Sequence, residues 1–277
     1  MKVRILTAII GMIVVLGLVW LGGIPFTAAV FAVAVLALLE YWRMLKKVNV
    51  TVMLKPAMLF LLLIIGASGS YSVPLFFGTI LFSFIFLLYL ILVLKQSEMN
   101  DLIYTVFGVL YFGVGFGALS MLRGMELLPV PAESSIEQGI FFILFALIGT
   151  WASDSFAYFA GKKWGKHKMA PHISPNKTME GLVGGFIGCI WLDTVFAAWF
   201  QIDVFKAFVF SVVIGIMAPM GDLFESYIKR VCGLKDSGNI LPGHGGMMDR
   251  FDSLLFVAPC LLAALLMFQK RGMVVQR

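Results

Sequence analysis

Long apolar runs recur along this chain and constrain its fold more than any other feature. A helix rises about 1.5 Å per residue, so about 20 apolar residues cross the roughly 30 Å hydrocarbon core of a bilayer. The residues are 61% hydrophobic and 13% charged, whereas a soluble domain has roughly 25% charged residues. We therefore predict an all-α, polytopic membrane protein of about nine transmembrane helices. The nine runs lie near 5–22, 24–40, 57–73, 75–95, 102–121, 136–160, 179–200, 204–228 and 252–269.

The runs also predict how the chain is organised. The third run is the weakest, because "GASGSYS" (66–72) dilutes it, and eight spans is the alternative. The first run follows "MKVR" with no small-residue cleavage site behind it, so we interpret it as an uncleaved anchor. We predict an N-terminal region, 1–135, with about five spans and a catalytic region, 136–277, with about four.

The placement of lysine and arginine predicts the orientation. With the N-terminus in the cytosol, 16 of the 21 basic residues fall in the N-terminal stub and the even-numbered loops. This asymmetry favours a cytoplasmic N-terminus, with loops 161–178 and 229–251 in the cytosol, although the basic C-terminal tail argues the other way. The net charge of +6 suits anionic lipid head groups or phosphate ligands. It does not indicate nucleic acid, because the sequence contains no soluble basic domain.

Three predicted helices carry acids near their cytosolic ends. Asp222, Glu225, Ser226 and Lys229 have i, i+3, i+4 and i+7 spacing and share one helix face. Asp154 and Asp249 lie at the ends of two other runs. Isolated Lys or Arg at such ends is ordinary interfacial charge, because their long stems reach water. Aspartate reaches less far and is costly to bury without a cation. We therefore expect the three aspartates to serve a function in one polar cavity.

The residues around these acids suit phosphate chemistry. Carboxylates from different helices are the usual protein contribution to a Mg²⁺ site that phosphate oxygens complete. The backbone N–H groups of "PGHGG" (242–246) could form an anion-binding concavity, and His244 either binds phosphate or shapes that turn. Thr178 fits the N-cap of the seventh helix. Positive charge is available from Lys177, Lys229, Arg230, Lys235 and Arg250.

This inventory predicts a metal-assisted phosphoryl or nucleotidyl transfer at the lipid–water boundary. A phosphate nucleophile is largely dianionic near neutral pH, because its second pKa is about 6. Such a reaction needs charge neutralisation and in-line positioning rather than a strong general base. The sequence agrees, since it has only three histidines and no evident nucleophile–base pair.

The stretch "SYIKRVCGLKDSGNILPGHGGMMDRFD" (226–252) resembles the signature of the phosphatidate cytidylyltransferases, or CDP-diacylglycerol synthases. "WASDSFAYFAGKKWGK" and "SPNKTMEG" resemble two further stretches of that family, except that Asn176 stands where a lysine is common. The residues in register with the signature are Ser226, Lys229, Arg230, Lys235, Asp236, His244, Gly245, Gly246, Asp249, Arg250 and Asp252.

The resemblance implies that CTP and phosphatidate react to give CDP-diacylglycerol and pyrophosphate in the cytosolic leaflet of a bacterial inner membrane. It implies Mg²⁺ held by Asp222 and Asp249, K⁺ at a paired cation site, and a homodimer. Asp154 and the residues in register would serve catalysis, with Gly245 and Gly246 binding CTP. Lys177, Lys229, Arg230 and Arg250 would contact phosphates of CTP or lipid, without a division between the two substrates.

Two other functions remain as alternatives. An ion-coupled transporter would use intramembrane acids, but those groups usually lie near the midplane and in repeated halves. A CTP-dependent polyprenol kinase would differ in its acceptor, so comparing phosphatidate with polyprenol separates the two enzymes. Two features outside the signature have structural interpretations. The glycines of "GLVGGFIGC" predict close helix packing, and Asp193 is expected at a helix interface or facing water.

Overall fold

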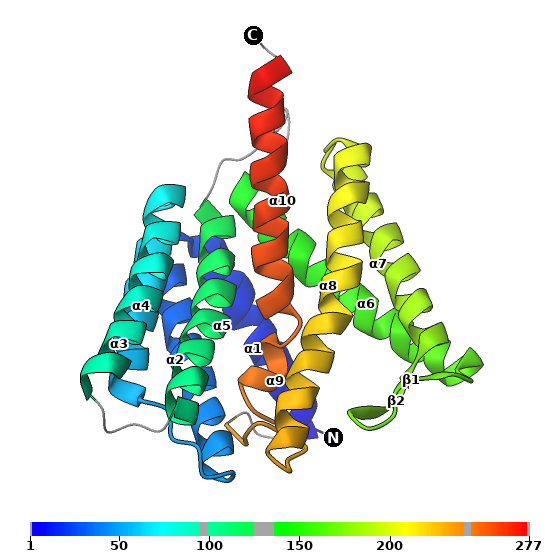
Figure 1. Cartoon of the computed structure of the whole chain (residues 1–277). Coiled ribbons are helices and arrows are strands. Elements are labelled where there is room, and N and C mark those ends of the chain that lie inside the picture. The colour runs from blue at the N-terminus through cyan, green and yellow to red at the C-terminus, as the bar shows by residue number, and fades with distance from the viewer. Residues whose placement is uncertain (1, 95–98, 125–135, 241–244, 276–277) are drawn as a thin grey trace. The chain divides into compact units, whose positions relative to one another are not determined.

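The computed structural model describes residues 2–94, 99–124, 136–240 and 245–275, and within them it confirms the all-α architecture. The elements are α1 (Lys2–Leu21), α2 (Gly23–Lys46), α3 (Leu54–Ser68), α4 (Val73–Leu94), α5 (Met99–Gly124), α6 (Gln138–Trp164), β1 (Lys168–Ala170), β2 (Ser174–Thr178), α7 (Met179–Trp199), α8 (Val204–Val231), α9 (Met248–Phe251) and α10 (Leu254–Val275). Figure 1 shows that helices dominate and that the two strands form one small hairpin.

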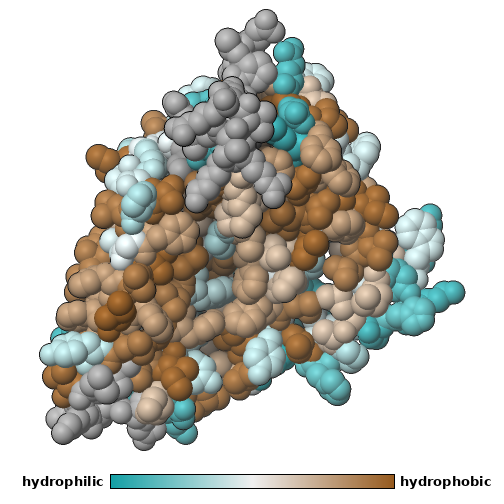
Figure 2. All heavy atoms as spheres, turned by 45° about the horizontal axis from the view of Figure 1, so that its top comes forward, coloured by the Kyte–Doolittle hydropathy of each residue, from teal (hydrophilic) through white to brown (hydrophobic). Residues whose placement is uncertain are grey.

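Most of these helices suit a bilayer. Within the described residues, seven are long and apolar enough to cross a membrane: α2, α4, α5, α6, α7, α8 and the segment Met248–Gln269. The apolar parts of α1 (Ile9–Leu21) and α3 (Leu54–Ser68) are shorter, and α3 corresponds to the run that the sequence marks as weakest. Large apolar side chains such as Trp20, Ile24 and Trp199 are exposed on the helices, and apolar residues cover much of the face in Figure 2. The protein is therefore an integral membrane protein.

The chain forms two compact units, which are described separately. The first unit contains Met1–Gly124 and Ile228–Phe251, and the second contains Met125–Tyr227 and Asp252–Arg277. The first unit thus holds α1 to α5, the last residues of α8, the loop that follows and α9. The second holds α6, α7, most of α8, the β-hairpin and α10.

An aromatic core holds the first unit together. The rings of Tyr41 on α2 and Phe112 on α5 meet edge to face, with centroids 5.7 Å apart. Gly108 allows this approach, because a Cβ there would lie 2.9 Å from the Tyr41 ring. Arg123 at the end of α5 is buried and donates hydrogen bonds to the carbonyl oxygens of Val19 and Trp20. Arg123 therefore satisfies backbone groups that lack a partner at the end of α1.

Close packing of α6 against α7 organises the second unit (Figure 1). A Cβ at Gly185 would lie 2.6 Å from the carbonyl oxygen of Ser153, and one at Gly181 would lie 2.9 Å from that of Ala157. The glycine pattern of α7 therefore does what the sequence predicts, because small residues let two backbones approach. Asp193 on α7 is completely buried against α6, so of the two positions expected for it, at a helix interface or facing water, the structure shows the first.

Candidate active site

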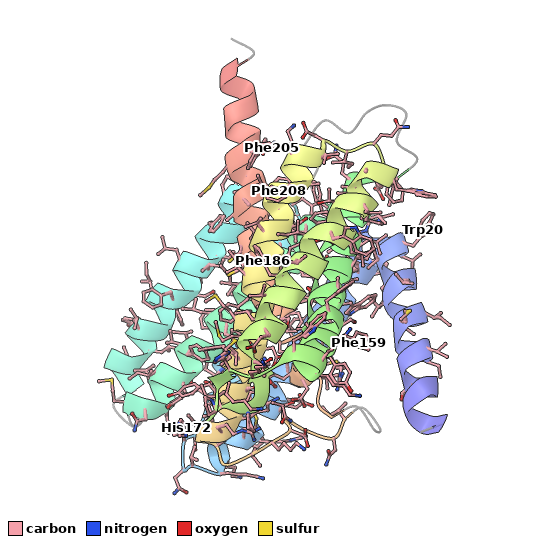
Figure 3. The ribbon with its side chains drawn as sticks, turned by 90° about the vertical axis from the view of Figure 1, so that its right-hand side faces the viewer. Trp20, Phe159, His172, Phe186, Phe205 and Phe208 are labelled. Atoms are coloured by element: carbon pink, nitrogen blue, oxygen red, sulfur yellow. The ribbon has the colours of Figure 1, made fainter. Side chains whose placement is uncertain are left out.

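The β-hairpin connects α6 to α7 and carries the "SPNKT" stretch as β2. It pairs antiparallel, with Lys168 opposite Thr178 and Ala170 opposite Ser174. Thr178 ends β2 and begins α7: its Oγ1 accepts a hydrogen bond from the Gly181 backbone N–H at 3.1 Å, so the predicted N-cap is confirmed. His172 lies in the turn of the hairpin (Figure 3). This cap fixes the exit of the hairpin and thereby the position of Lys177.

A polar cavity of about 670 Å³ lies in the second unit. It is lined by residues from α6, β2, α7 and α8, among them Asp154, Tyr158, Asn176, Lys177 and Asp222. The structure therefore brings Asp154, Lys177 and Asp222 to one cavity, although they are far apart in the sequence. Asn176 also lines this cavity.

One ion pair crosses this cavity. The Lys177 Nζ lies 2.6 Å from the Asp222 Oδ2, and the two side chains are 25% and 31% exposed. The other oxygen of Asp222 accepts a hydrogen bond from the Ser226 hydroxyl at 3.4 Å. Although the Lys177 Nζ itself is buried, both side chains are partly exposed, so the pair contributes little to stability and Lys177 can leave Asp222 at low cost.

An apolar hollow of about 300 Å³ adjoins the polar cavity. The two share Met169, Leu182 and Pro219 in their linings. Phe186 on α7 lies against α8 in this hollow (Figure 3), where a Cβ at Gly215 would come within 2.8 Å of its ring. A polar cavity that continues into an apolar one suits an amphiphilic ligand with a charged head and a hydrocarbon tail.

The signature loop of the first unit is organised around Asp249 on α9. The Lys229 Nζ lies 2.7 Å from the Asp249 Oδ1, and both side chains are 10% exposed. The Asp249 Oδ2 accepts hydrogen bonds from the Ser237 backbone N–H at 3.0 Å, the Ser237 hydroxyl at 2.8 Å and the Gly246 backbone N–H at 2.8 Å. Asp249 is thus tightly held by its own loop.

Gly245 and Gly246 of this loop pack against Asp249. Gly245 has a φ of +82°, which favours glycine, and a Cβ there would lie 2.8 Å from the Asp249 Oδ2. The Gly246 N–H donates to Asp249, so this amide orients the carboxylate. His244 lies outside the described residues.

The remaining predicted residues lie at the ends of α8 and around α9. Arg230 is exposed, and its Nη1 donates to the Leu234 carbonyl oxygen at 2.7 Å. Lys235, Asp236 and Arg250 are exposed in the first unit. Asp252 belongs to the second unit, where its carbonyl oxygen would lie 2.5 Å from a Cβ at Gly221.

The structure also identifies an acid that the sequence interpretation missed. Glu40 on α2 is completely buried and accepts hydrogen bonds from the backbone of Met247 and Met248 in the first unit. A signal was available in "ALLEYWRMLK", where Glu40 follows an apolar run, since an acid in such a run is costly and often functional.

The acids have a limited capacity to hold a metal by themselves. Among the residues that the structure describes, no group of three or more His, Cys, Asp and Glu side chains is arranged as a metal site. Asp154 and Asp222 nevertheless line the same cavity. Two carboxylates suffice for Mg²⁺ when waters and substrate phosphates supply the other oxygens. The donor set therefore fits a cation that arrives with a nucleotide.

Comparison with known proteins places these features in a family. Residues 2–268 match the cytidylyltransferase family. The phosphatidate cytidylyltransferase of Bacillus subtilis (strain 168) is 35% identical over 278 residues, which cover 97% of this chain and 98% of that protein. Those of Staphylococcus haemolyticus (strain JCSC1435) and Staphylococcus aureus (strain COL) are 34% and 36% identical over 266 residues, which cover 94% of this chain and 97% of each protein.

Proposed function

The chain belongs to the cytidylyltransferase family, and we propose that it is a CTP:phosphatidate cytidylyltransferase, which makes CDP-diacylglycerol and pyrophosphate for phospholipid biosynthesis. Relatives named phosphatidate cytidylyltransferase align over nearly the whole chain, which supports the same two substrates here. The observation that carries the proposal is the cavity of the second unit. It combines Asp154, Lys177 and Asp222 with an apolar hollow, as an amphiphilic phosphate requires.

In the proposed reaction an oxygen of the lipid phosphate attacks the α-phosphorus of CTP. The bond between that phosphorus and the oxygen bridging to the β-phosphate breaks, and its electron pair leaves with pyrophosphate. The attacking phosphate is largely dianionic at neutral pH, so no side chain has to remove its proton. The work of the protein is to position the phosphates and to neutralise their charge, for which Lys162 and Lys177 line the cavity.

The weak Lys177–Asp222 pair suits this role. A partly exposed ion pair contributes about 0–1 kcal/mol, so Lys177 can turn from Asp222 to an arriving phosphate at little cost. Mg²⁺, with K⁺ at a paired site, fits the oxygen donors of Asp222 and phosphate, and it would neutralise charge on the departing pyrophosphate. The sharing of one cation by Asp222 and Asp249 stays a prediction from the sequence, because the two residues belong to separately described units.

The signature residues of the first unit complete the proposal. Lys229 is held by Asp249, whereas Arg230, Lys235 and Arg250 are exposed, and we propose that they contact phosphates. Contacts of His244 and of the Gly245 and Gly246 backbone with CTP stay predictions, as do the roles of Ser226, Asp236 and Asp252. The distribution of basic residues supports a cytoplasmic N-terminus and a cytosolic site in a bacterial inner membrane. A homodimer is proposed from family resemblance alone.

Pyrophosphate release tests the function directly. The full chain, purified in detergent, is incubated with CTP, Mg²⁺ and phosphatidate, with each component omitted in turn. We expect release only when all three are present, and a loss of at least about 100-fold in an Asp222→Asn variant that keeps its fold. A Lys206→Gln variant, on the part of α8 remote from the cavity lining, serves as the matched control and should retain activity.

Two outcomes would contradict the proposal. Release from well-folded protein that does not depend on phosphatidate would exclude phosphatidate as the acceptor. Incorporation of phosphate into a polyprenol in place of phosphatidate would instead identify a polyprenol kinase.

A further inference from the structure

Glu40 connects α2 to the signature loop, about 200 residues later in the chain. Its side chain is 0% exposed. The Oε1 accepts a hydrogen bond from the Met247 backbone N–H at 2.9 Å, and the Oε2 accepts from the Met248 backbone N–H at 2.8 Å. The Ser237 hydroxyl lies 3.2 Å from the same Oε2. All these residues belong to the first unit.

The two amides that Glu40 binds stand at the start of α9, which spans only Met248–Phe251. The first N–H groups of a helix have no partner within the helix, and one turn of helix is unstable alone. Glu40 therefore supplies acceptors that α9 cannot supply for itself. Since Asp249 and Arg250 are residues of α9, the direction of their side chains depends on this anchor.

Ser237 joins Glu40 to Asp249. Its hydroxyl lies 3.2 Å from the Glu40 Oε2 and 2.8 Å from the Asp249 Oδ2. The hydroxyl carries one proton, so it donates to one of the two carboxylates at a time. Through this bridge and the α9 backbone, Glu40 is coupled to the acid that holds Lys229. Glu40 itself stays beneath the loop and does not reach the exposed side of α9.

Glycines of the signature leave room for Glu40. A Cβ at Gly238 would lie 2.6 Å from the Glu40 Oε1, and one at Gly246 would lie 2.5 Å from the Oε2. Neither glycine has a positive φ, so the backbone conformation does not require glycine at these positions. Contact with the buried carboxylate supplies a physical reason for both.

We propose that Glu40 is a positioning residue of the active site: it fixes Ser237 and the start of α9 so that Asp249 and Lys229 keep the orientation needed for phosphate chemistry. The proposal rests on the proposed cytidylyltransferase function for its effect on rate, but the anchoring of the loop stands apart from that function. Burying a carboxylate in a candidate membrane span is costly. The hydrogen bonds between the Glu40 carboxylate and the loop offset that cost, and holding the loop is a reason for an acid at this position.

The test compares Glu40→Gln with Tyr41→Phe in the full chain. The glutamine keeps the size of the side chain, but its NH₂ group cannot accept a backbone hydrogen bond. Tyr41→Phe is the matched control, because it removes one buried hydrogen bond, to the Tyr104 carbonyl oxygen, from the neighbouring position of α2. We measure Tm, hydrogen exchange of the 245–251 backbone amides, and kcat and KM for both substrates.

We expect Glu40→Gln to speed exchange of the 245–251 amides and to lower kcat by roughly 10–100-fold, with a much smaller change in KM. Tyr41→Phe should lower Tm by a similar amount without either effect. A Glu40→Gln variant with wild-type exchange in 245–251 would overturn the anchor. Faster exchange with wild-type kcat would overturn the positioning role.

A second variant tests the proposal if Glu40→Gln folds poorly. Gly238→Ala keeps the Glu40 side chain, but the added Cβ would lie 2.6 Å from its Oε1, so exchange and kcat should change in the same direction as in Glu40→Gln. No change in either would contradict the proposal. If the wild-type chain releases no pyrophosphate with phosphatidate, the proposed function fails. The exchange measurement then still decides whether Glu40 anchors the loop.

Discussion

Two aspartate–lysine ion pairs of this protein contain the same charged groups but differ in how far their side chains are buried. Lys177 and Asp222 in the second unit meet at 2.6 Å, with side chains 25% and 31% exposed on a cavity. Lys229 and Asp249 in the first unit meet at 2.7 Å, with both side chains 10% exposed. Asp249 also accepts three hydrogen bonds from its loop, whereas the one to Asp222 comes from Ser226 at 3.4 Å.

This difference indicates a division of labour. A partly exposed pair gains little from its attraction and exchanges partners readily, which suits a group that receives substrate. A buried ion pair is stable only when further hydrogen bonds compensate for the lost hydration. Removing one partner leaves the other charge buried and uncompensated. We therefore expect the Lys177–Asp222 pair to respond to ligands and the Lys229–Asp249 pair to maintain the loop.

The largest expected effect is that of Asp249→Asn. It removes the carboxylate charge that the buried Lys229 ammonium contacts and weakens the acceptor of three hydrogen bonds. We expect a loss of about 3–5 kcal/mol in the free energy of unfolding, measured by denaturant unfolding in mixed micelles. A loss below about 1 kcal/mol would mean that the two pairs do not differ as their burial indicates.

Gly246→Ala should have the next largest effect. The new Cβ would meet the Ser237 hydroxyl and the Glu40 Oε2, so the loop has to shift. Overpacking of this kind costs about 1–3 kcal/mol in unfolding free energy. Gly78→Ala on α4 is the control: nothing lies within 4 Å of its added Cβ, so it should be neutral or slightly stabilising.

Thr178→Ala tests the N-cap that positions Lys177 of the partly exposed Lys177–Asp222 pair. It removes the N-cap bond to the Gly181 N–H, and we expect a loss of about 1 kcal/mol in unfolding free energy. Thr178→Ser keeps an oxygen acceptor and should recover most of that loss. If alanine and serine are equally destabilising, the cap does not hold the hairpin that carries Lys177.

The smallest expected effect on stability is that of Asp222→Asn. Because its pair with Lys177 is partly exposed, we expect a change below about 1 kcal/mol in unfolding free energy, measured as for Asp249→Asn. Activity should nevertheless fall sharply, as in the pyrophosphate assay above. A large loss of stability at Asp222 would show that both pairs are structural and would remove the proposed division.

Several features followed from local sequence alone. The spacing of apolar residues predicted the helices, because a bilayer forces the backbone to satisfy its own hydrogen bonds. Thr178 before Gly181 predicted an N-cap, and the glycines of α7 predicted close helix packing, for which the structure supplies α6 as the partner. Each of these signals lies within a short stretch of sequence. Both partners of the N-cap, or the whole spacing pattern of a helix, can therefore be recognised without knowing the tertiary structure.

The acids show where such reasoning stops. The sequence predicted that Asp154, Asp222 and Asp249 are functional carboxylates, but which lysine pairs with Asp222 and which with Asp249 depends on packing. Lys177 near the end of β2 is separated from Asp222 by α7 and the first part of α8, and these elements had to fold before the pair at 2.6 Å could exist. Burial distinguishes the two pairs, and no local pattern encodes burial.

By itself, then, the sequence determined an all-α membrane protein with charged signature segments at the ends of its helices, because bilayer thickness and motif spacing are properties of short segments. Only the tertiary structure decided that residues 228–251 pack with the N-terminal helices. It also decided that Glu40 holds Met248 across 208 positions of the chain. Contacts between residues so far apart in the chain form when the apolar faces of their helices are buried together. The hydrogen bonds of the buried Glu40 carboxylate then favour one conformation of the loop that leads to α9.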